Sequence, residues 1–139
     1  MKKILMIMAL AFMGTSMFAG TPPKAVKDAF AKKFPTATKV RWGKEDVKEW
    51  EAEFTYEGSK ISANFAKDGS WLETETQIKV AALPTKVAEA IAKQYPGWKI
   101  VEADKTETSK NGLIYEADVK KGASKKGVAY KEDGTAVKE

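Results

Sequence analysis

The chain has 139 residues, of which 43% are hydrophobic and 31% charged, and it contains neither cysteine nor histidine. The absence of these two residue types excludes disulfide frameworks, thiolate and haem ligation, ordinary zinc sites and the Ser-His-Asp and Cys-His catalytic sets. The formal net charge of +5 comes from lysines interspersed with acidic residues, with Arg41 as the single arginine, and this composition speaks against nucleic-acid binding.

The first 19 residues have the layout of a secretory signal peptide. Lys2 and Lys3 precede an uninterrupted apolar run from Ile4 to Met13, which is too short to span a bilayer. We expect cleavage after Ala19, which removes two lysines and leaves a mature chain with a charge of +5 − 2 = +3. The expected location is therefore the periplasm or the cell exterior, with no membrane insertion after the signal is removed.

The segment after the signal peptide predicts a helix followed by strands. Pro23 stands where a helix start tolerates proline, Val26 and Phe30 recur at helical spacing, and Phe34-Pro35 ends the helix. From about residue 39 a period of two takes over, which is typical of strands with one buried face. In the clearest of these strands the hydrophobic face consists of Trp50, Ala52, Phe54 and Tyr56.

The same order of elements recurs in the second half of the chain. Residues 84–96 match residues 23–35 at an offset of 61, and residues 115–119 match residues 50–54 at an offset of 65. The four extra residues fall around Lys110-Asn111-Gly112, a tight-turn signal. We therefore predict an α+β fold in which one helix packed on a four-stranded antiparallel sheet is repeated in tandem.

The predicted boundaries are a signal peptide at 1–19, a first helix-plus-sheet repeat at 20–76, a linker at 77–83 and a second repeat at 84–139. A unit of about 57 residues is marginal alone, so we expect the two to join sheets or to pack helices. Each helix covers one face of its sheet and leaves the other face open.

Carboxylates are the only catalytic or metal-ligating groups that remain. Glu51 and Glu53 point the same way from one strand, as do Glu116 and Asp118. Glycosidase carboxylates face each other across a cleft, so a solvated sheet face is favoured over a catalytic pair. The turns at Asp68-Gly69 and Asp133-Gly134 lack the alternating oxygen ligands of a calcium loop and are predicted to be hairpin turns. No cofactor and no metal is expected.

Tryptophans and lysines supply the candidate contact residues. Trp50 belongs to the buried series, whereas Trp42, Trp71 and Trp98 have no settled face and would be contact anchors if exposed. Lysines crowd the end of the second repeat (Lys120, Lys121, Lys125, Lys126 and Lys131). They either attract an acidic partner or keep an edge strand from pairing with another chain, and the second interpretation is favoured.

The passage from Asp68 through Gly69-Ser70-Trp71-Leu72-Glu73-Thr74-Glu75, continuing to Leu83-Pro84 and Tyr95-Pro96-Gly97, resembles the PepSY-like family of secreted bacterial proteins. That family is related in fold to the beta-lactamase-inhibitor protein. The resemblance implies a helix on a four-stranded antiparallel sheet, twice, and an exported location. The resemblance also implies binding and inhibition of hydrolases through an open concave sheet, as in related folds, and it supplies no catalytic motif to carry over.

The sequence thus predicts an exported, non-enzymatic binding protein that uses an open sheet face, with inhibition of a hydrolase or peptidase as its specific version. The alternative is an envelope module that binds a small molecule or glycan through exposed tryptophans. The expected partner is another envelope or secreted protein, and a monomer is expected. The candidate binding residues are Arg41, Trp42, Glu51, Glu53, Trp71, Trp98, Glu116 and Asp118.

Overall fold

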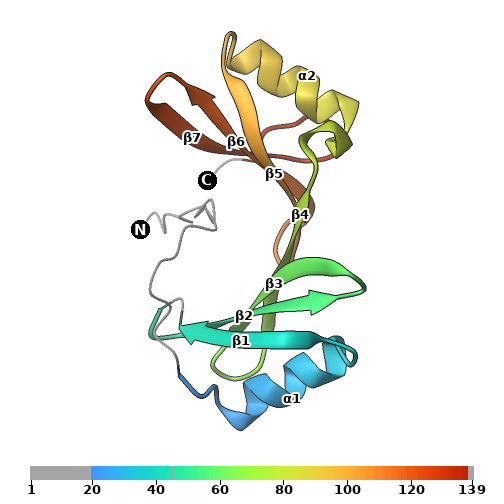
Figure 1. The fold of residues 1–139 in the computed structure, drawn as a ribbon, viewed down its shortest axis with the longest axis vertical. Helices are drawn as coiled ribbons and strands as arrows, with labels where there is room; N and C mark the ends of the chain where they lie inside the picture. Colours follow the sequence, from blue (N-terminus) through green and yellow to red (C-terminus); the bar gives the residue numbers. More distant parts are fainter. Residues whose placement is uncertain (1–19, 45, 138–139) are drawn as a thin grey trace. The chain divides into compact units, whose positions relative to one another are not determined.

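The computed structural model describes residues 20–44 and 46–137, so the predicted signal peptide lies outside the described residues. The elements follow one another as α1 (Lys24–Lys33), β1 (Thr38–Lys44), β2 (Glu49–Tyr56), β3 (Ser59–Ala66), β4 (Trp71–Ile78), the 3-10 helix η1 (Val80–Ala82), α2 (Thr85–Gln94), β5 (Lys99–Thr108), β6 (Gly112–Lys121) and β7 (Ser124–Tyr130) (Figure 1). Neither α1 nor α2 is long and apolar enough to cross a membrane.

Both α-helices begin and end where prolines and apolar spacing predict. The Pro23 carbonyl accepts the first helical bond of α1 from Val26, and the Pro84 carbonyl accepts the corresponding bond of α2 from Val87. At the other end, the Phe34 N–H closes α1 on the Phe30 carbonyl 2.8 Å away. The proline that follows Phe34 drives that residue out of the α region, so the helix stops there.

The strands form one antiparallel sheet, and the prediction of two four-stranded sheets is wrong. The strand order among the described residues is β1-β2-β3-β4-β5-β6-β7, so the sheet has seven strands. Where an eighth strand was expected, after the turn at Asp133-Gly134, only an isolated bridge joins Tyr130 to Ala136. Strand β5 runs on to Thr108, and the Ser109 N–H just beyond it donates to the Leu72 carbonyl of β4 at 2.8 Å. The β4 edge is thereby paired instead of being left exposed.

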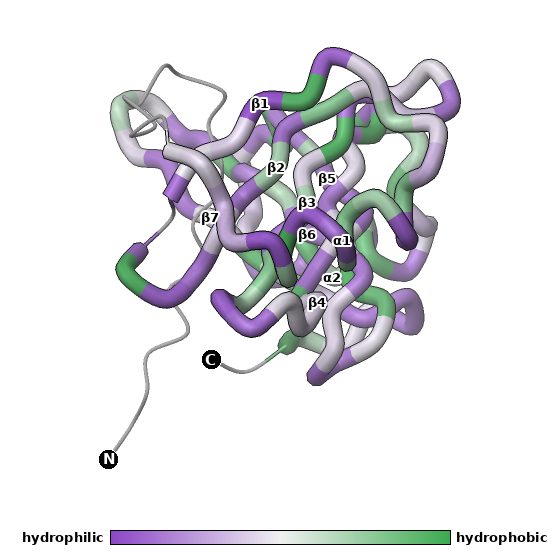
Figure 2. The backbone as a smooth tube through the Cα atoms, turned by 90° about the horizontal axis from the view of Figure 1, so that it is seen from below, coloured by the Kyte–Doolittle hydropathy of each residue, from purple (hydrophilic) through white to green (hydrophobic). Residues whose placement is uncertain are grey.

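The described chain divides into two compact units. The first unit comprises residues 20–76 with 107–112, and the second comprises residues 77–106 with 113–137. Hydrophilic and hydrophobic residues interleave along the chain in both units (Figure 2). This is the pattern of strands with one buried face.

The core of the first unit lies between α1 and one face of β2 and β3. Phe30 of α1 packs edge-on against Phe54 with ring centroids 4.9 Å apart, and against Trp42 at 5.1 Å. Such edge-to-face pairs add to the free energy gained by burying the rings. The buried side chains of this core are Val26, Phe30, Phe34, Trp50, Ala52, Phe54, Ala63 and Phe65.

The core of the second unit is built in the same way and is more aliphatic. Val87 and Ile91 of α2 are fully or almost fully buried against β5, β6 and β7. The Tyr130 hydroxyl at the end of β7 donates a 2.6 Å hydrogen bond to Gln94 at the end of α2. The buried side chains of this core are Leu83, Val87, Ile91, Ala103, Tyr115, Ala117, Val119, Val128 and Tyr130.

In each unit an Asp-Gly turn presses against the first turn of the helix. Gly69 has a φ of +91°, and a Cβ there would lie 2.7 Å from the Ala25 carbonyl oxygen. Gly134 has a φ of +84°, and its Cβ would lie 2.6 Å from the Lys86 carbonyl oxygen. Only glycine combines this backbone conformation with so close an approach. The predicted hairpin turns are therefore also contacts between sheet and helix.

Candidate functional site

Carboxylates gather on the sheet face that points away from the helix in the first unit. Because Trp50, Ala52 and Phe54 face α1, Glu51 and Glu53 point to the opposite side. The register places Asn64 and Glu73 in one cross-strand row with Glu51. It places Ser62 and Glu75 in the next row with Glu53. Each row therefore carries one carboxylate on either side of a neutral polar residue.

Arg41 and Lys60 place positive charges on this face, Lys60 directly across from Thr55 of β2. Arg41 lies directly across from Glu53 in the β1–β2 register, after a bulge between Thr38 and Arg41. Cross-strand pairs of opposite charge are favourable at this spacing. The structure therefore brings together three of the predicted site residues: Arg41, Glu51 and Glu53.

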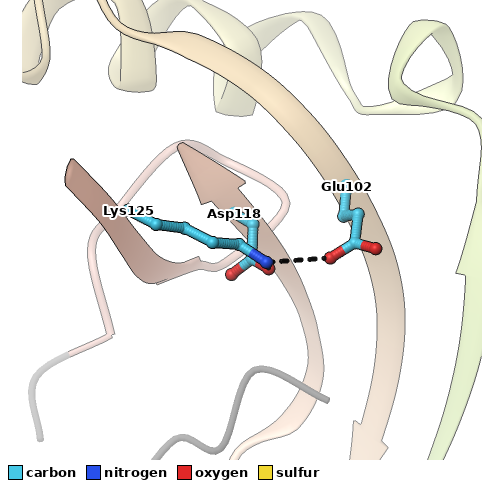
Figure 3. Close-up of polar contacts among 3 residues, drawn as sticks. All are labelled: Glu102, Asp118 and Lys125. Atoms are coloured by element: carbon cyan, nitrogen blue, oxygen red, sulfur yellow. Dashed lines mark hydrogen bonds and ion pairs between the residues drawn. The ribbon is translucent and has the colours of Figure 1, made fainter. Parts of the chain in front are cut away.

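The second unit carries a tighter cluster, which we define as Glu102, Asp104, Asp118 and Lys125. The Lys125 ammonium on β7 lies 2.6 Å from Asp118 Oδ2 on β6 and 3.3 Å from Glu102 Oε2 on β5. Figure 3 shows Lys125 reaching past Asp118 towards Glu102. The hydrogen bond to Asp118 is the main cause that raises the pKa of Lys125, so the ammonium remains charged.

Asp104 is the electrostatically strained member of this cluster. Burial is the largest cause that raises its pKa, followed by the negative charges of Glu102 and Asp118, and the pKa reaches about 6. A carboxyl group with this pKa is partly protonated near neutral pH. The cluster therefore holds more negative charge than its single lysine compensates.

Glu116 and Asp118, predicted to point the same way from one strand, lie on the face of β6 away from α2. Glu116 accepts a 3.1 Å hydrogen bond from the buried Thr106 hydroxyl of β5. The expectation of a solvated face is wrong for Asp118, which is 4% exposed, and for Glu51, which is 3% exposed. Both lie on inner strands with neighbours on either side, and Lys125 also covers Asp118.

The predicted tryptophan anchors lie on the other side of the sheet. Trp42 and Trp71 pack against the core of the first unit and Trp98 against that of the second. The Trp71 indole N–H donates to Thr74 at 2.9 Å, and the Lys33 ammonium lies 4.1 Å from the Trp71 ring centroid. The tryptophans therefore contribute to the packing of helix on sheet. The structure does not bring these side chains together with the carboxylates of the opposite face.

The lysines at the end of the second repeat have two different roles. β7 is the last strand in the sheet order, which fits lysines that protect an edge from pairing. Lys125 neutralises carboxylates on the face opposite to α2. Lys126 lies 5.6 Å from the Trp98 ring centroid and 5.9 Å from that of Tyr95.

Sequence reasoning missed Glu102 and Asp104 as site residues, and it favoured an edge-protecting role for Lys125. The facing of β5 is ambiguous from Trp98, Ile100 and Val101, so its acidic residues could not be assigned to a face. A signal was present, because Glu102 and Asp104 are two apart and both flank Ala103, a core residue.

The chemistry open to these groups is the binding of cations. Within residues 20–44 and 46–137, no set of three or more acidic residues has a geometry that would hold a metal ion. Ionised carboxylates accept charge-assisted hydrogen bonds from ammonium and guanidinium groups.

Residues 48–136 match the family described as "Putative beta-lactamase-inhibitor-like, PepSY-like". The chain belongs to this PepSY-like family. The match includes β2 to β7 and α2, and therefore most of both carboxylate-bearing surfaces. The family description is that of an inhibitor-like protein and names no catalytic activity.

Solved structures from Bacteroides share the fold. A BLIP-like protein from Bacteroides fragilis is 24% identical and aligns over 86% of this chain and 85% of its own, with a TM-score of 0.74. A DUF2874 family protein from Bacteroides ovatus is 26% identical over 86% of each chain, with a TM-score of 0.75. A structure from Bacteroides eggerthii described as "putative periplasmic proteins" is 21% identical over 86% of this chain and 88% of its own, with a TM-score of 0.75. No curated protein matches the chain.

Proposed function

We propose that this protein is an exported, non-enzymatic binding protein that holds its partner on the carboxylate-bearing face of its sheet. One observation carries the proposal: carboxylates gather on the helix-free face in both units. A face dominated by one sign of charge accelerates the approach of an oppositely charged partner and selects against others. These carboxylates belong to Glu51, Glu53, Glu73, Glu75, Glu102, Asp104, Glu116 and Asp118.

Export is supported by two independent observations. The first 19 residues have the basic, apolar and small-residue regions of a signal peptide in the right order. One structure with the same fold is described as periplasmic. The partner is accordingly another envelope or secreted protein.

The specific version of this proposal is inhibition of a hydrolase or peptidase. Its support is the family description and the BLIP-like name of one structure with the same fold. Fold likeness does not carry function with it, so the enzyme has to be found by experiment.

A pull-down from the envelope fraction of the source cell tests the proposal. The mature protein serves as bait beside the double variant Glu53→Lys/Glu116→Lys, which changes one half-exposed carboxylate in each unit. The control is Asp28→Lys/Glu89→Lys, which makes the same charge change on exposed helix positions. We expect one identified protein to be retained by the wild type and the control and lost by the sheet variant. Equal capture by all three baits would refute the sheet face as the binding surface.

The alternative function, glycan or small-molecule binding through exposed tryptophans, has less support. All four tryptophans pack against a core cluster or belong to one. A ligand that stacked on their rings would have to displace these contacts. Retention of a defined glycan or lipid by the mature protein, without any protein partner, would favour this alternative.

A further inference from the structure

We propose that Asn111 is a modification site, at which spontaneous loss of the side-chain amide converts the asparagine into isoaspartate. The inference does not depend on the proposed function. It rests on how the folded chain holds the three turns in which a glycine follows an asparagine or an aspartate.

The reaction needs only the chain itself and water. The backbone nitrogen of Gly112 loses its proton to solvent and attacks Asn111 Cγ. The new nitrogen–carbon bond closes a five-membered imide, while the bond from Cγ to Nδ2 breaks and ammonia leaves with a proton from solvent. Water then opens the imide at one of its two carbonyl carbons. Opening at the backbone carbonyl leaves isoaspartate, in which the chain runs through Cβ and Cγ, and opening at Cγ leaves aspartate. Asparagine is accordingly among the thermolabile residues of proteins.

The turn between β5 and β6 leaves both reacting residues open to solvent. Asn111 and Gly112 are exposed, and a Cβ at Gly112 would meet no atom within 4 Å. Because glycine has no side chain, it shields its own backbone nitrogen less than any other residue does. Exposed loop tips open at little cost in free energy, so the attacking geometry is accessible without unfolding of the protein.

The two Asp-Gly turns, which have the same atoms in place for an imide, are held closed. In Asp68-Gly69 and Asp133-Gly134 the glycine N–H donates at 2.9 Å to the carbonyl oxygen three residues earlier, that of Ala66 and of Lys131. The residue after each glycine donates hydrogen bonds to the aspartate, and these bonds are the main cause that lowers the pKa of both carboxyls. An ionised carboxylate is a poor electrophile, so we expect no conversion at either turn.

Asn64, the other asparagine of the chain, is an internal control. It lies on β3 between Glu51 of β2 and Glu73 of β4, it is 7% exposed, and the bulky Phe65 follows it. Attack by the Phe65 nitrogen requires β3 to open, which costs much more free energy than the opening of a loop tip. The two asparagines therefore differ in the step that limits the reaction.

Conversion to isoaspartate changes the backbone of the turn as well as its charge. The Thr108 hydroxyl accepts a hydrogen bond from the Asn111 N–H at 2.9 Å and donates one to the Gly112 carbonyl oxygen at 3.2 Å. Isoaspartate inserts one more carbon between these two backbone groups, so we expect the hydroxyl to lose one of its two bonds. The neighbouring Ser109 N–H pairs with the Leu72 carbonyl of β4, and loosening of the turn weakens this pairing too.

Mass spectrometry of the intact mature protein and of its fragments, during incubation at pH 8, tests the proposal. We expect a gain of about 1 Da at Asn111, where an amide becomes a carboxyl group. Its rate should lie within about tenfold of that of a free peptide of residues 108–115, and Asn64 should convert at least about tenfold more slowly than Asn111. A protein-isoaspartate methyltransferase should label the incubated wild type and leave the matched variant Asn111→Gln unlabelled.

A second measurement tests the effect on the turn. Asn111→Asp carries the new charge without the extra backbone carbon, so the isoaspartate-containing protein should unfold at a lower urea concentration than this variant. Equal midpoints would remove the effect on the turn.

Three outcomes overturn the modification site itself. Conversion of Asn64 as fast as Asn111 would mean that exposure of the turn gives no selectivity. Conversion of Asn111 only in urea would mean that the folded turn protects it. A product that the methyltransferase does not label would mean that water hydrolyses the amide directly, without the imide.

Discussion

At Gly69 and Gly134 the absence of a Cβ allows a turn of the sheet to pack directly against the helix. Both lie in the left-handed region, and both bring a turn into contact with a carbonyl oxygen of the first helical turn. Gly58, in the β2–β3 turn, has a similar φ of +81° but nothing within 4 Å of its would-be Cβ. Substituting alanine at Gly69 and at Gly58 therefore distinguishes two effects on stability. At Gly58 only the positive φ is unfavourable, whereas at Gly69 the new Cβ also meets the helix backbone.

We expect Gly69→Ala to lower the free energy of unfolding by about 2–4 kcal/mol, because the new methyl group must displace backbone atoms of α1 as well as adopt a positive φ. Gly58→Ala should cost only about 1 kcal/mol, since it meets the conformational penalty alone. Urea unfolding followed by circular dichroism measures both. Equal losses in the two variants would show that the contact with Ala25 adds nothing.

The raised pKa of Asp104 predicts that this single side chain makes the free energy of unfolding depend on pH. Its pKa in the folded protein, about 6, lies above its ordinary value of 3.8. The stability that its protonated form contributes is therefore fully present below about pH 4 and is lost as the pH rises through 6. We expect Asp104→Asn to be more stable than the wild type at pH 8, by about 1 kcal/mol after solvent screening, and close to it at pH 4. Urea titrations of wild type, Asp104→Asn and Glu89→Gln at both pH values check this, and the Glu89→Gln curve should run parallel to that of the wild type.

Among the elements, the helices were the most predictable. Their ends are determined by local chemistry, namely Pro23 and Pro84 at the starts and the residue before proline at the ends, so no tertiary information is needed. The strands with strict alternation, such as β2, were predictable for the same reason. The extent of β5 was not, because ten residues with acidic and apolar side chains in irregular order give no clear face. Pairing with β4 and β6 determines that face, and pairing is a long-range property.

Phe30 anchors α1 to the sheet and tests the role of that helix. Its ring meets those of Phe34, Trp42, Phe54 and Phe65 at centroid distances of 4.9–6.2 Å. We expect Phe30→Ala to lower the free energy of unfolding by about 3–5 kcal/mol, because it removes these contacts and leaves a cavity. Lys32→Ala, on the exposed side of the same helix, should change it by less than about 0.5 kcal/mol. Chemical unfolding measures both, and a small effect of Phe30→Ala would mean that α1 contributes little to the first unit.

For the whole molecule, the positive net charge gives no indication of the carboxylate-bearing faces on which the proposed function rests. The chain is basic overall, with a formal charge of +5, yet eight of its acidic residues lie on the helix-free faces of the two units, whereas α1 carries four lysines and one acidic residue. The sequence predicted that Glu51, Glu53, Glu116 and Asp118 share a face within each strand, because alternation is local. It could not predict that Lys125 and Glu102 join Asp118, because those contacts depend on which strands become neighbours.

The proposed export makes a prediction for the N-terminus of the protein. Expression in the source cell should yield a chain that begins at Gly20, because the apolar run ends before the small residues at Ala19-Gly20. Mass spectrometry of the intact envelope protein measures this directly. A chain that retains Met1 and remains in the cytoplasm would contradict both the signal peptide and the envelope partner.

The placement of the tryptophans determines which structural changes the intrinsic fluorescence of this protein can detect. Trp42, Trp50 and Trp71 sit in or against the core of the first unit, and Trp98 is the single indole of the second. Intrinsic emission therefore follows the unfolding of the helix-covered cores, with three of the four indoles in the first unit, and we expect it to respond little to a partner that binds the carboxylates of the opposite face. A Trp98→Phe protein would make the emission a reporter of the first unit alone, so that the unfolding of this unit can be followed by itself.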